Sequence, residues 1–412
     1  MPKIAQNLKK VHEKLQIGLV MNILILKENG IAPHLGGIAR ISYDLMNALC
    51  ERGFSTYLLS WNKDCKIVYD NRHYFFPNSS NFFSDENLLY LMDFCNSHSI
   101  DIIINQCFSS SIINFLYNVK TNCNVRIVSV IHNNFVQYSE TFIFRREWSL
   151  RNRQLSYIYY LFKAKPFLLL YRQIARLKYH KTAKDLYSYS DKIVLVSKGN
   201  ISEFLFLLYN KDPLKKLVSI ENFTTPVEDN FSLDYKKENV VWCGTVSYGV
   251  KKADWILEIW KFIEAKSTKW NLYILGDSPS IKDLKAYSNK LQLKRVSFEG
   301  RVNPDTYYKN ASILCSTSVS ESFGLVFIEA MKYKIVPVSF ASSPAIKDII
   351  SDVGVLIKPF DKKEYAIQLL NLMNHREQRN GLAEKCYIRS KLYFKDAIID
   401  KWISLFNSFV NN

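Results

Sequence analysis

Short apolar runs alternate with segments of helical periodicity along most of the chain, a pattern typical of parallel α/β proteins. In the first half we predict strands at 22–26, 55–60, 101–105, 126–131 and 191–197. Between the first two strands, apolar residues recur at helical spacing from Ile38 to Leu49, and Gly53 ends the predicted helix. A strand, a glycine-containing loop, a helix and a strand in this order predict the βαβ start of a Rossmann-like domain.

The second half repeats the pattern after a polar segment at 226–239, which we interpret as an interdomain linker. The predicted strands lie at 240–243, 270–275, 296–300, 313–315, 335–338 and 353–359, and the predicted helices at 253–265, 304–310, 325–331 and 363–373. A chain of 412 residues is long enough for two such domains. We expect an N-terminal extension at 1–20 (Met21 would serve as well as a start), a first domain at 21–228 joined by a C-terminal helix at about 393–412, and a second domain at 229–392.

The stretch 311–340 carries the clearest chemistry. It predicts a strand, a loop, a helix and a second strand, with Glu321 in the loop, Glu329 in the helix and Gly324 between them. A carboxylate can accept two hydroxyl protons from a sugar or a ribose, and a helix N-terminus attracts a diphosphate. The stretch therefore suits a sugar nucleotide, although an ordinary βαβ unit with two solvated glutamates fits the spacing as well.

Two loops of the first half are further candidates for ligand binding. Gly36 and Gly37 lie in the loop after the first strand, where bare backbone can approach a phosphate. His132 follows the strand at 126–131, at the edge where open α/β sheets bind ligands. Taken alone, two glycines are weak evidence, and a loop histidine is more often structural.

Residues 142–184 form a stretch, called here the basic stretch, that holds eleven Arg or Lys against one acid, Glu147. Aromatic residues are interleaved with these charges. Basic side chains that flank an apolar face suit a helix on an anionic membrane surface. Two ordinary helices, each with one buried and one solvated face, are the alternative, and no nucleic-acid-binding module is recognisable.

The composition is that of a soluble globular protein with an anionic partner. The net charge of +17 indicates attraction to a membrane leaflet, to nucleic acid or to a phosphorylated substrate. Eight cysteines without a C-x-x-C pair favour reduced thiols. No stretch is convincing as a membrane span or a secretory signal, so we expect a cytoplasmic protein, with peripheral attachment to the inner face of the membrane through the basic stretch.

The sequence ESFGLVFIEA, which begins at Glu321, resembles the E-(seven residues)-E signature of glycosyltransferase family 4. GGIAR at 36–40, DKIVLVS at 191–197, and Gly244 followed by Lys251 resemble further blocks of that family. The resemblance implies the GT-B fold, which is two Rossmann-like α/β domains facing across a cleft, and a retaining, metal-independent reaction. It is strong over about 240–375, moderate over 21–60 and sparse from 61 to 225.

The resemblance also implies roles for individual residues. Glu321 would lie at the donor sugar together with His132, Glu329 would bind the ribose, and Lys251 would take the charge of the leaving diphosphate. The other positions implied to line the donor are Ser322, Phe323, Gly324, Leu325, Gly36, Gly37, Gly244 and Arg301.

Two positions depart from the family pattern. Ser322 stands where the family usually has Gly, and Thr245 stands where it usually has Arg, which puts part of the phosphate clamp in doubt. Lys252 and Arg40 are the candidates to replace that charge. The resemblance implies neither a metal nor a cofactor, because the nucleotide sugar is a substrate.

We therefore expect transfer of a hexosyl or related residue from a nucleotide diphosphate sugar, with UDP favoured and GDP as the alternative. The expected acceptor is a hydroxyl of a glycan or of a polyprenyl-linked glycan in bacterial surface polysaccharide synthesis. Nucleic acid is not an expected partner. The alternatives are a non-catalytic GT-B subunit, a sugar-nucleotide epimerase and a basic peripheral membrane-binding protein.

Overall fold

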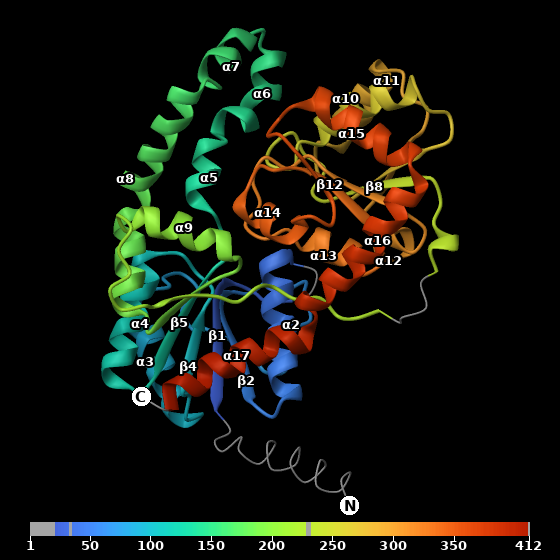
Figure 1. Cartoon of the computed structure of the whole chain (residues 1–412). Helices are drawn as coiled ribbons and strands as arrows, with labels where there is room; N and C mark the ends of the chain where they lie inside the picture. The colour runs from blue at the N-terminus through green and yellow to red at the C-terminus, as the bar shows by residue number, and fades with distance from the viewer. Residues whose placement is uncertain (1–20, 33–34, 228–231, 411–412) are drawn as a thin grey trace, which may run out of the picture. The chain divides into compact units, whose positions relative to one another are not determined.

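The computed structural model describes residues 21–32, 35–227 and 232–410 (Figure 1). The chain forms two compact units. One holds the described residues up to Ile131 together with Lys184–Val194, and the other holds His132–Ala183 and the described residues from Leu195 onward. The predicted extension at 1–20 and part of the predicted linker lie outside the described residues. The predicted domain boundaries group the chain differently and stay a prediction.

The first half of the chain builds a seven-stranded sheet with the order β3-β2-β1-β4-β5-β6-β7 (Figure 1). Its strands are β1 (Asn22–Asn29), β2 (Ser55–Asn62), β3 (His73–Phe75), β4 (Ile102–Asn105), β5 (Arg126–Ile131), β6 (Lys192–Leu195) and β7 (Leu217–Ser219). The pairing is parallel from β3 through β5, with Ile23 of β1 beside Ile102 of β4. The Ile, Leu and Val runs of β1, β4 and β5 are buried, as in a sheet that helices cover on both faces.

The helices of this half follow signals that the sequence contains. They are α2 (Gly37–Glu51), α3 (Asp85–Ser97), α4 (Ser110–Asn122), α5 (Phe135–Glu140), α6 (Phe142–Asn152), α7 (Ser156–Phe162), α8 (Lys165–Tyr189) and α9 (Lys198–Leu207). The hydroxyl of Ser84 caps α3 by accepting from the backbone N–H of Asn87. The predicted apolar face of α2 is buried, and Gly53 has a positive φ of 91° after the helix end.

The second half builds a six-stranded parallel sheet with the order β10-β9-β8-β11-β12-β13. Its strands are β8 (Asn239–Cys243), β9 (Asn271–Leu275), β10 (Val296–Gly300), β11 (Ile313–Ser316), β12 (Val336–Phe340) and β13 (Val355–Ile357). Its helices are η1 (Leu233–Tyr235), α10 (Ala253–Glu264), α11 (Ile281–Lys290), α12 (Asp305–Tyr308), α13 (Leu325–Met331), α14 (Pro344–Ile350), α15 (Lys362–Asn374), α16 (Arg376–Ser390), η2 (Lys391–Tyr393) and α17 (Lys395–Val410).

The core of the second sheet also includes part of the basic stretch. α10 is buried along most of its length and contributes Trp255 and Trp260 to this core. Ile143 and Phe144 of α6 and Tyr159 of α7 belong to the same apolar cluster. The basic stretch is therefore helical, with one face packed into the protein.

Glycine is required where β8 and β9 end. Gly276 has a φ of 129°, and a Cβ there would lie 1.9 Å from the carbonyl oxygen of Gly244. The backbone N–H of Gly244 donates to the carbonyl of Leu275 at 3.0 Å. This close approach fixes the start of the loop that follows β8.

Each strand predicted from the sequence is present within a few residues of its predicted position. Among the elements that the sequence did not single out are β3, β7, α3, α4, α9, α11 and α14. All eight cysteines are free thiols, and five of them are buried. In the part of the chain that the structure describes, no helix has both the length and the apolar character needed to cross a bilayer.

Candidate functional site

The loops after β8 and β11 define a candidate site. The two strands are neighbours in the second sheet, and the strand order reverses between them, since β9 lies on the other side of β8. Open α/β sheets bind ligands at such a reversal, outside the carboxyl ends of the strands. The candidate site therefore comprises the β8 loop, residues 244–252, and the β11 loop, residues 317–324.

Lys251 and Glu321 meet across these two loops. Nζ of Lys251 lies 2.5 Å from Oε1 of Glu321 in a charge-assisted hydrogen bond. The side chains are 25% and 11% exposed, so the pair is only partly covered. A Cβ at Gly244 would lie 3.7 Å from the Lys251 side chain, which therefore passes over this glycine. The structure thus brings three predicted site residues together from two separate loops.

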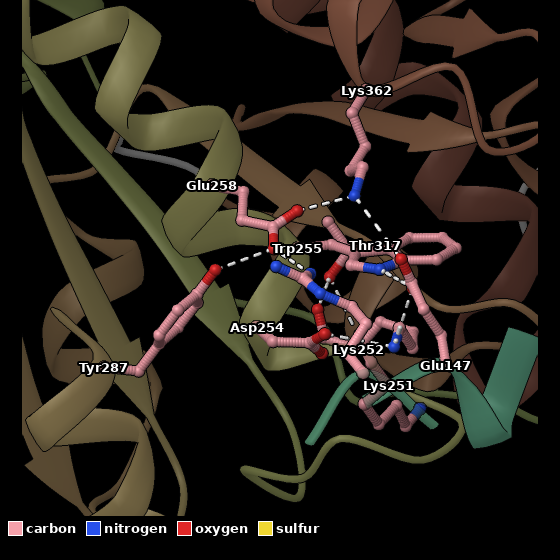
Figure 2. Close-up of polar contacts among 10 residues, drawn as sticks. Glu147, Lys251, Lys252, Asp254, Trp255, Glu258, Tyr287, Thr317 and Lys362 are labelled. Atoms are coloured by element: carbon pink, nitrogen blue, oxygen red, sulfur yellow. Dashed lines mark hydrogen bonds and ion pairs between the residues drawn. The ribbon is translucent and has the colours of Figure 1, made fainter. Parts of the chain in front are cut away.

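Thr317 contacts the end of the β8 loop at two backbone carbonyls (Figure 2). Oγ1 of Thr317 lies 2.9 Å from the carbonyl oxygens of both Lys251 and Lys252. The same oxygen accepts a hydrogen bond from the indole N–H of Trp242 at 3.0 Å. Because Thr317 directly follows β11, the position of Lys251 is set by the strand that also leads to Glu321.

Polar groups of Asn134, which caps α5, of Gln137 in α5 and of Asn200 in α9 bind the β11 loop. The backbone N–H of Asn134 donates to Oγ of Ser322 at 3.0 Å, and the amide of Asn200 donates to the Ser322 carbonyl at 2.6 Å. Ser320 donates to Oε1 of Gln137 at 3.0 Å. The hydroxyl that distinguishes Ser322 from the usual glycine therefore has a partner. His132, half-buried directly after β5, lies two residues before Asn134.

Gly324 forms the turn into α13. Its φ is 98°, and a Cβ there would lie 2.7 Å from the Phe327 ring, so glycine is required at this position. Phe323 is buried, and Leu325 begins the helix. Glu329 is half-buried in α13. Burial raises the pKa of Tyr308 well above its usual range, with smaller contributions from Cys243 and Glu329.

Lys252 has a different environment from Lys251. Its side chain is fully buried, and Nζ lies 3.0 Å from Oδ2 of Asp254 and 3.3 Å from Oε2 of Glu147. Burial raises the pKa of Asp254 to about 6, while the ammonium of Lys252 opposes that rise. Because two carboxylates already bind the buried ammonium of Lys252, the predicted contact between Lys252 and the donor phosphates is not favoured.

The remaining predicted residues lie on other elements or elsewhere in the β8 loop. Gly36 and Gly37 belong to the first unit, in the loop after β1, where the order of the first sheet reverses between β1 and β4. Arg40 is in α2. Thr245 is exposed in the β8 loop, and Arg301 is exposed directly after β10. Their roles stay predictions.

Sequence reasoning missed the residues that hold the site. The sequence did not single out Thr317, Asn134 or Asn200, and nothing in their spacing indicates their contacts. Glu147 could have been found, because it is the single acid of the basic stretch. Within the described ranges, His, Cys, Asp and Glu side chains form no group of three that could hold a metal ion.

Comparison with known proteins supports a glycosyltransferase of the GT-B fold. Residues 237–375 match the family model described as Glycosyl transferases group 1. The chain is 28% identical over 216 residues to an uncharacterized glycosyltransferase of Haemophilus influenzae. This match covers 52% of this chain and 60% of that protein. It is 24% identical over 221 residues to the amylovoran biosynthesis glycosyltransferase AmsD of Erwinia amylovora, with coverage of 53% and 60%.

The similarity in structure extends over nearly the whole chain. A crystal structure of a TarM variant from S. aureus in complex with fondaparinux, α-GlcNAc-glycerol and UDP has a TM-score of 0.70 and 14% identity. The match covers 94% of this chain and 100% of that chain. The predicted fold class, two parallel-sheet α/β domains of the GT-B type, is therefore confirmed. The sequence matches, in contrast, span 60% of the length of these two curated relatives.

Proposed function

We propose that this chain is a retaining glycosyltransferase that moves a sugar from a nucleoside diphosphate sugar to a hydroxyl group without a metal. The observation that carries the proposal is the Lys251–Glu321 pair at the reversal point of the second sheet. Both residues lie inside the segment that matches Glycosyl transferases group 1. A cation for a diphosphate and a carboxylate for sugar hydroxyls thus occur side by side.

The reaction needs charge stabilisation where the bond between the anomeric carbon and the diphosphate breaks. Negative charge grows on the leaving phosphate, and the ammonium of Lys251 is placed to stabilise it. Glu321 accepts hydrogen bonds from the donor sugar, His132 contacts the same sugar, and Glu329 accepts hydrogen bonds from the ribose. The leaving phosphate itself takes the proton of the acceptor hydroxyl, so no side chain is assigned as general base.

The donor and the acceptor are proposed by class. UDP is the favoured nucleotide, supported by its presence in the TarM complex, and GDP is the alternative. The proposed acceptor is a glycan or a polyprenyl-linked glycan of bacterial surface polysaccharide synthesis. The relative named for amylovoran biosynthesis supports this class.

A thermal-shift panel of UDP, GDP, ADP and CMP in metal-free buffer tests donor binding. A ligand that binds the folded state raises the melting temperature. We expect one nucleoside diphosphate to raise it, and we expect Glu329→Ala to lose that shift. The absence of a shift with every nucleotide would contradict the proposal.

Glu321→Gln separates catalysis from binding. This variant should abolish transfer, because a neutral amide replaces the carboxylate at the donor sugar, while the nucleotide shift persists. Wild-type protein that binds the nucleotide but transfers nothing to any glycan acceptor would favour a non-catalytic subunit. Conversion of the donor sugar without an acceptor would favour an epimerase.

We also propose that the basic stretch contacts an anionic membrane surface. Leu170, Ile174 and Leu177 share one face of α8 and are 51%, 48% and 75% exposed. In α7, Tyr160 is 63% exposed, and Nζ of Lys163 lies 4.4 Å from its ring centre. Apolar side chains beside lysines suit the boundary between headgroups and acyl chains.

Vesicle sedimentation tests this surface. We expect binding to vesicles that contain phosphatidylglycerol, weaker binding to pure phosphatidylcholine, and loss of binding in the triple variant Leu170→Ser, Ile174→Ser and Leu177→Ser. Equal binding by this variant would contradict the proposal. Glu321→Gln is the matched control, since it should leave vesicle binding intact.

A further inference from the structure

A cluster of charged side chains, buried at Glu147, Lys252 and Asp254 and partly exposed at Arg151 and Lys362, connects α6 with α10 and α15 beside the candidate site (Figure 2). Its members are Glu147 and Arg151 of α6, Lys252, Asp254 and Glu258 at the start and in the first turns of α10, and Lys362 of α15. Glu147 is 5% exposed. Glu147, the single acid among the eleven basic residues of the basic stretch, therefore points into the protein interior.

Glu147 is bound at several points within this cluster. Its Oε2 accepts a hydrogen bond from the indole N–H of Trp255 and lies 3.3 Å from Nζ of Lys252. Its Oε1 lies 3.8 Å from Nζ of Lys362. A carboxylate that is buried among cations holds them in place, because separating the charges in a dry environment is costly.

The conformation of Lys252 connects this cluster to Lys251. Lys252 has left-handed backbone angles, φ 51° and ψ 53°, which a residue with a side chain adopts only where its surroundings hold it. Asp254 and Glu147 bind its ammonium, and Thr317 binds its carbonyl and that of Lys251. This turn directs the two adjacent lysines to different places: Lys252 into the cluster and Lys251 to Glu321.

We propose that Glu147 is a positioning residue for donor binding. By holding the ammonium of Lys252, it maintains the left-handed turn and keeps the ammonium of Lys251 opposite Glu321. The inference rests on the proposed function, in which Lys251 binds the diphosphate of the donor. Glu147 itself does not touch the donor and acts through Lys252.

The test is the affinity for UDP, measured by titration calorimetry on the full chain. Glu147→Gln keeps an oxygen that can accept from Trp255 but removes the charge that faces Lys252. Lys251→Ala should weaken UDP binding about tenfold or more, the value of one lost charge-assisted hydrogen bond. Glu147→Gln should weaken it about threefold, because the phosphate contact is displaced and not removed.

The double variant distinguishes positioning from general loosening. If Glu147 acts through Lys251, Glu147→Gln should change UDP affinity little once Lys251 is already alanine. Glu258→Gln is the matched control, a second carboxylate of the same cluster that binds Arg151, Lys362 and Tyr287 instead of Lys252. It should leave UDP affinity unchanged. Glu147→Asp, which keeps the charge, should restore most of the affinity and serves if the glutamine variant does not fold.

Three results would overturn the inference: wild-type UDP affinity in Glu147→Gln, the same threefold loss in the Lys251→Ala background, or an equal loss in Glu258→Gln. Failure of the proposed function gives a different pattern. In that case the wild-type protein binds no nucleoside diphosphate, or Lys251→Ala binds UDP as well as the wild type does, and the inference falls with it.

Discussion

Lys251 and Lys252 are adjacent and identical in type, yet they have opposite surroundings. Lys251 is one-quarter exposed and forms an ion pair with Glu321. Lys252 is fully buried and has two carboxylate partners. The contact of Lys251 is partly open, so this side chain can exchange its partner for a ligand. Lys252 has two buried contacts, which suit a role in stabilising the fold.

The difference arises from one backbone conformation. The left-handed turn at Lys252 rotates its side chain away from the direction of its neighbour. Residue type alone describes both lysines equally well. The family resemblance favours Lys251 for the diphosphate and leaves Lys252 as a candidate to replace the missing arginine. The surroundings of the two side chains support Lys251 as the proposed donor-binding residue and Lys252 as its support.

The largest expected effect is the loss of the buried cation. Lys252→Ala leaves Asp254 buried without its counter-ion and Glu147 with only the more distant Lys362, which should cost about 3–5 kcal/mol in the free energy of unfolding. Urea unfolding measures this loss. Lys252→Met, which keeps the aliphatic stem, should be nearly as unstable, and a loss below about 1 kcal/mol in both variants would show that the cluster does not depend on this charge.

Lys251→Ala should show the reverse behaviour. Its partly exposed ion pair contributes less than about 1 kcal/mol to stability, so urea unfolding should change little. The affinity for UDP should fall about tenfold or more, because the cation for the diphosphate is gone. A stability loss as large as that of Lys252→Ala would remove the distinction between the two lysines.

The pH dependence of stability should depend on Asp254. Because burial raises its pKa in the folded state from 3.8 to about 6, the folded protein takes up this proton more readily than the unfolded chain does. The resulting stabilisation is fully present below about pH 3.8 and is lost as the pH rises through 6. Asp254→Asn should remove it, so the variant should lose less stability than the wild type between pH 4 and 6. Parallel pH profiles from urea unfolding would contradict this assignment.

The smallest expected effect is that of salt. Raising NaCl to about 1 M shortens the screening length to about 3 Å, which weakens partly exposed ion pairs more than buried ones. The small stability difference between the wild type and Glu321→Gln should therefore shrink, while that between the wild type and Lys252→Met should persist. Equal salt sensitivity of the two differences would place both pairs in similar environments.

Most of the fold could be predicted from the sequence because its local signals agree. The apolar runs of β1, β4 and β5 and the helical spacing of α2 predict a parallel sheet covered by helices, and the structure has both. β3, a strand of three residues, escaped prediction because so short a segment carries no periodicity. Local patterns likewise do not show that α6 and α7 supply apolar residues to the core of the second sheet.

The candidate site could be predicted in part. Glu321, Gly324 and Lys251 lie in loops at the carboxyl ends of adjacent strands, and strand endings are visible in the sequence. Lys252 was included as a candidate to replace the charge that the family usually has at the position of Thr245. Thr317 and Asn200 were missed because their contacts join residues far apart in the chain, a relation that one sequence does not show.

The position of Glu147 has a consequence for exchanging parts between such proteins. Glu147 in α6 pairs with Lys252, and Lys252 pairs with Asp254 at the start of α10, so the contact joins two segments about 100 residues apart in the sequence. A chimaera that receives a foreign α6–α8 segment without an acid at this position would inherit an uncompensated lysine–aspartate pair and a displaced turn. Segments 142–152 and 252–254 therefore depend on each other, and a chimaera should exchange both of them or neither.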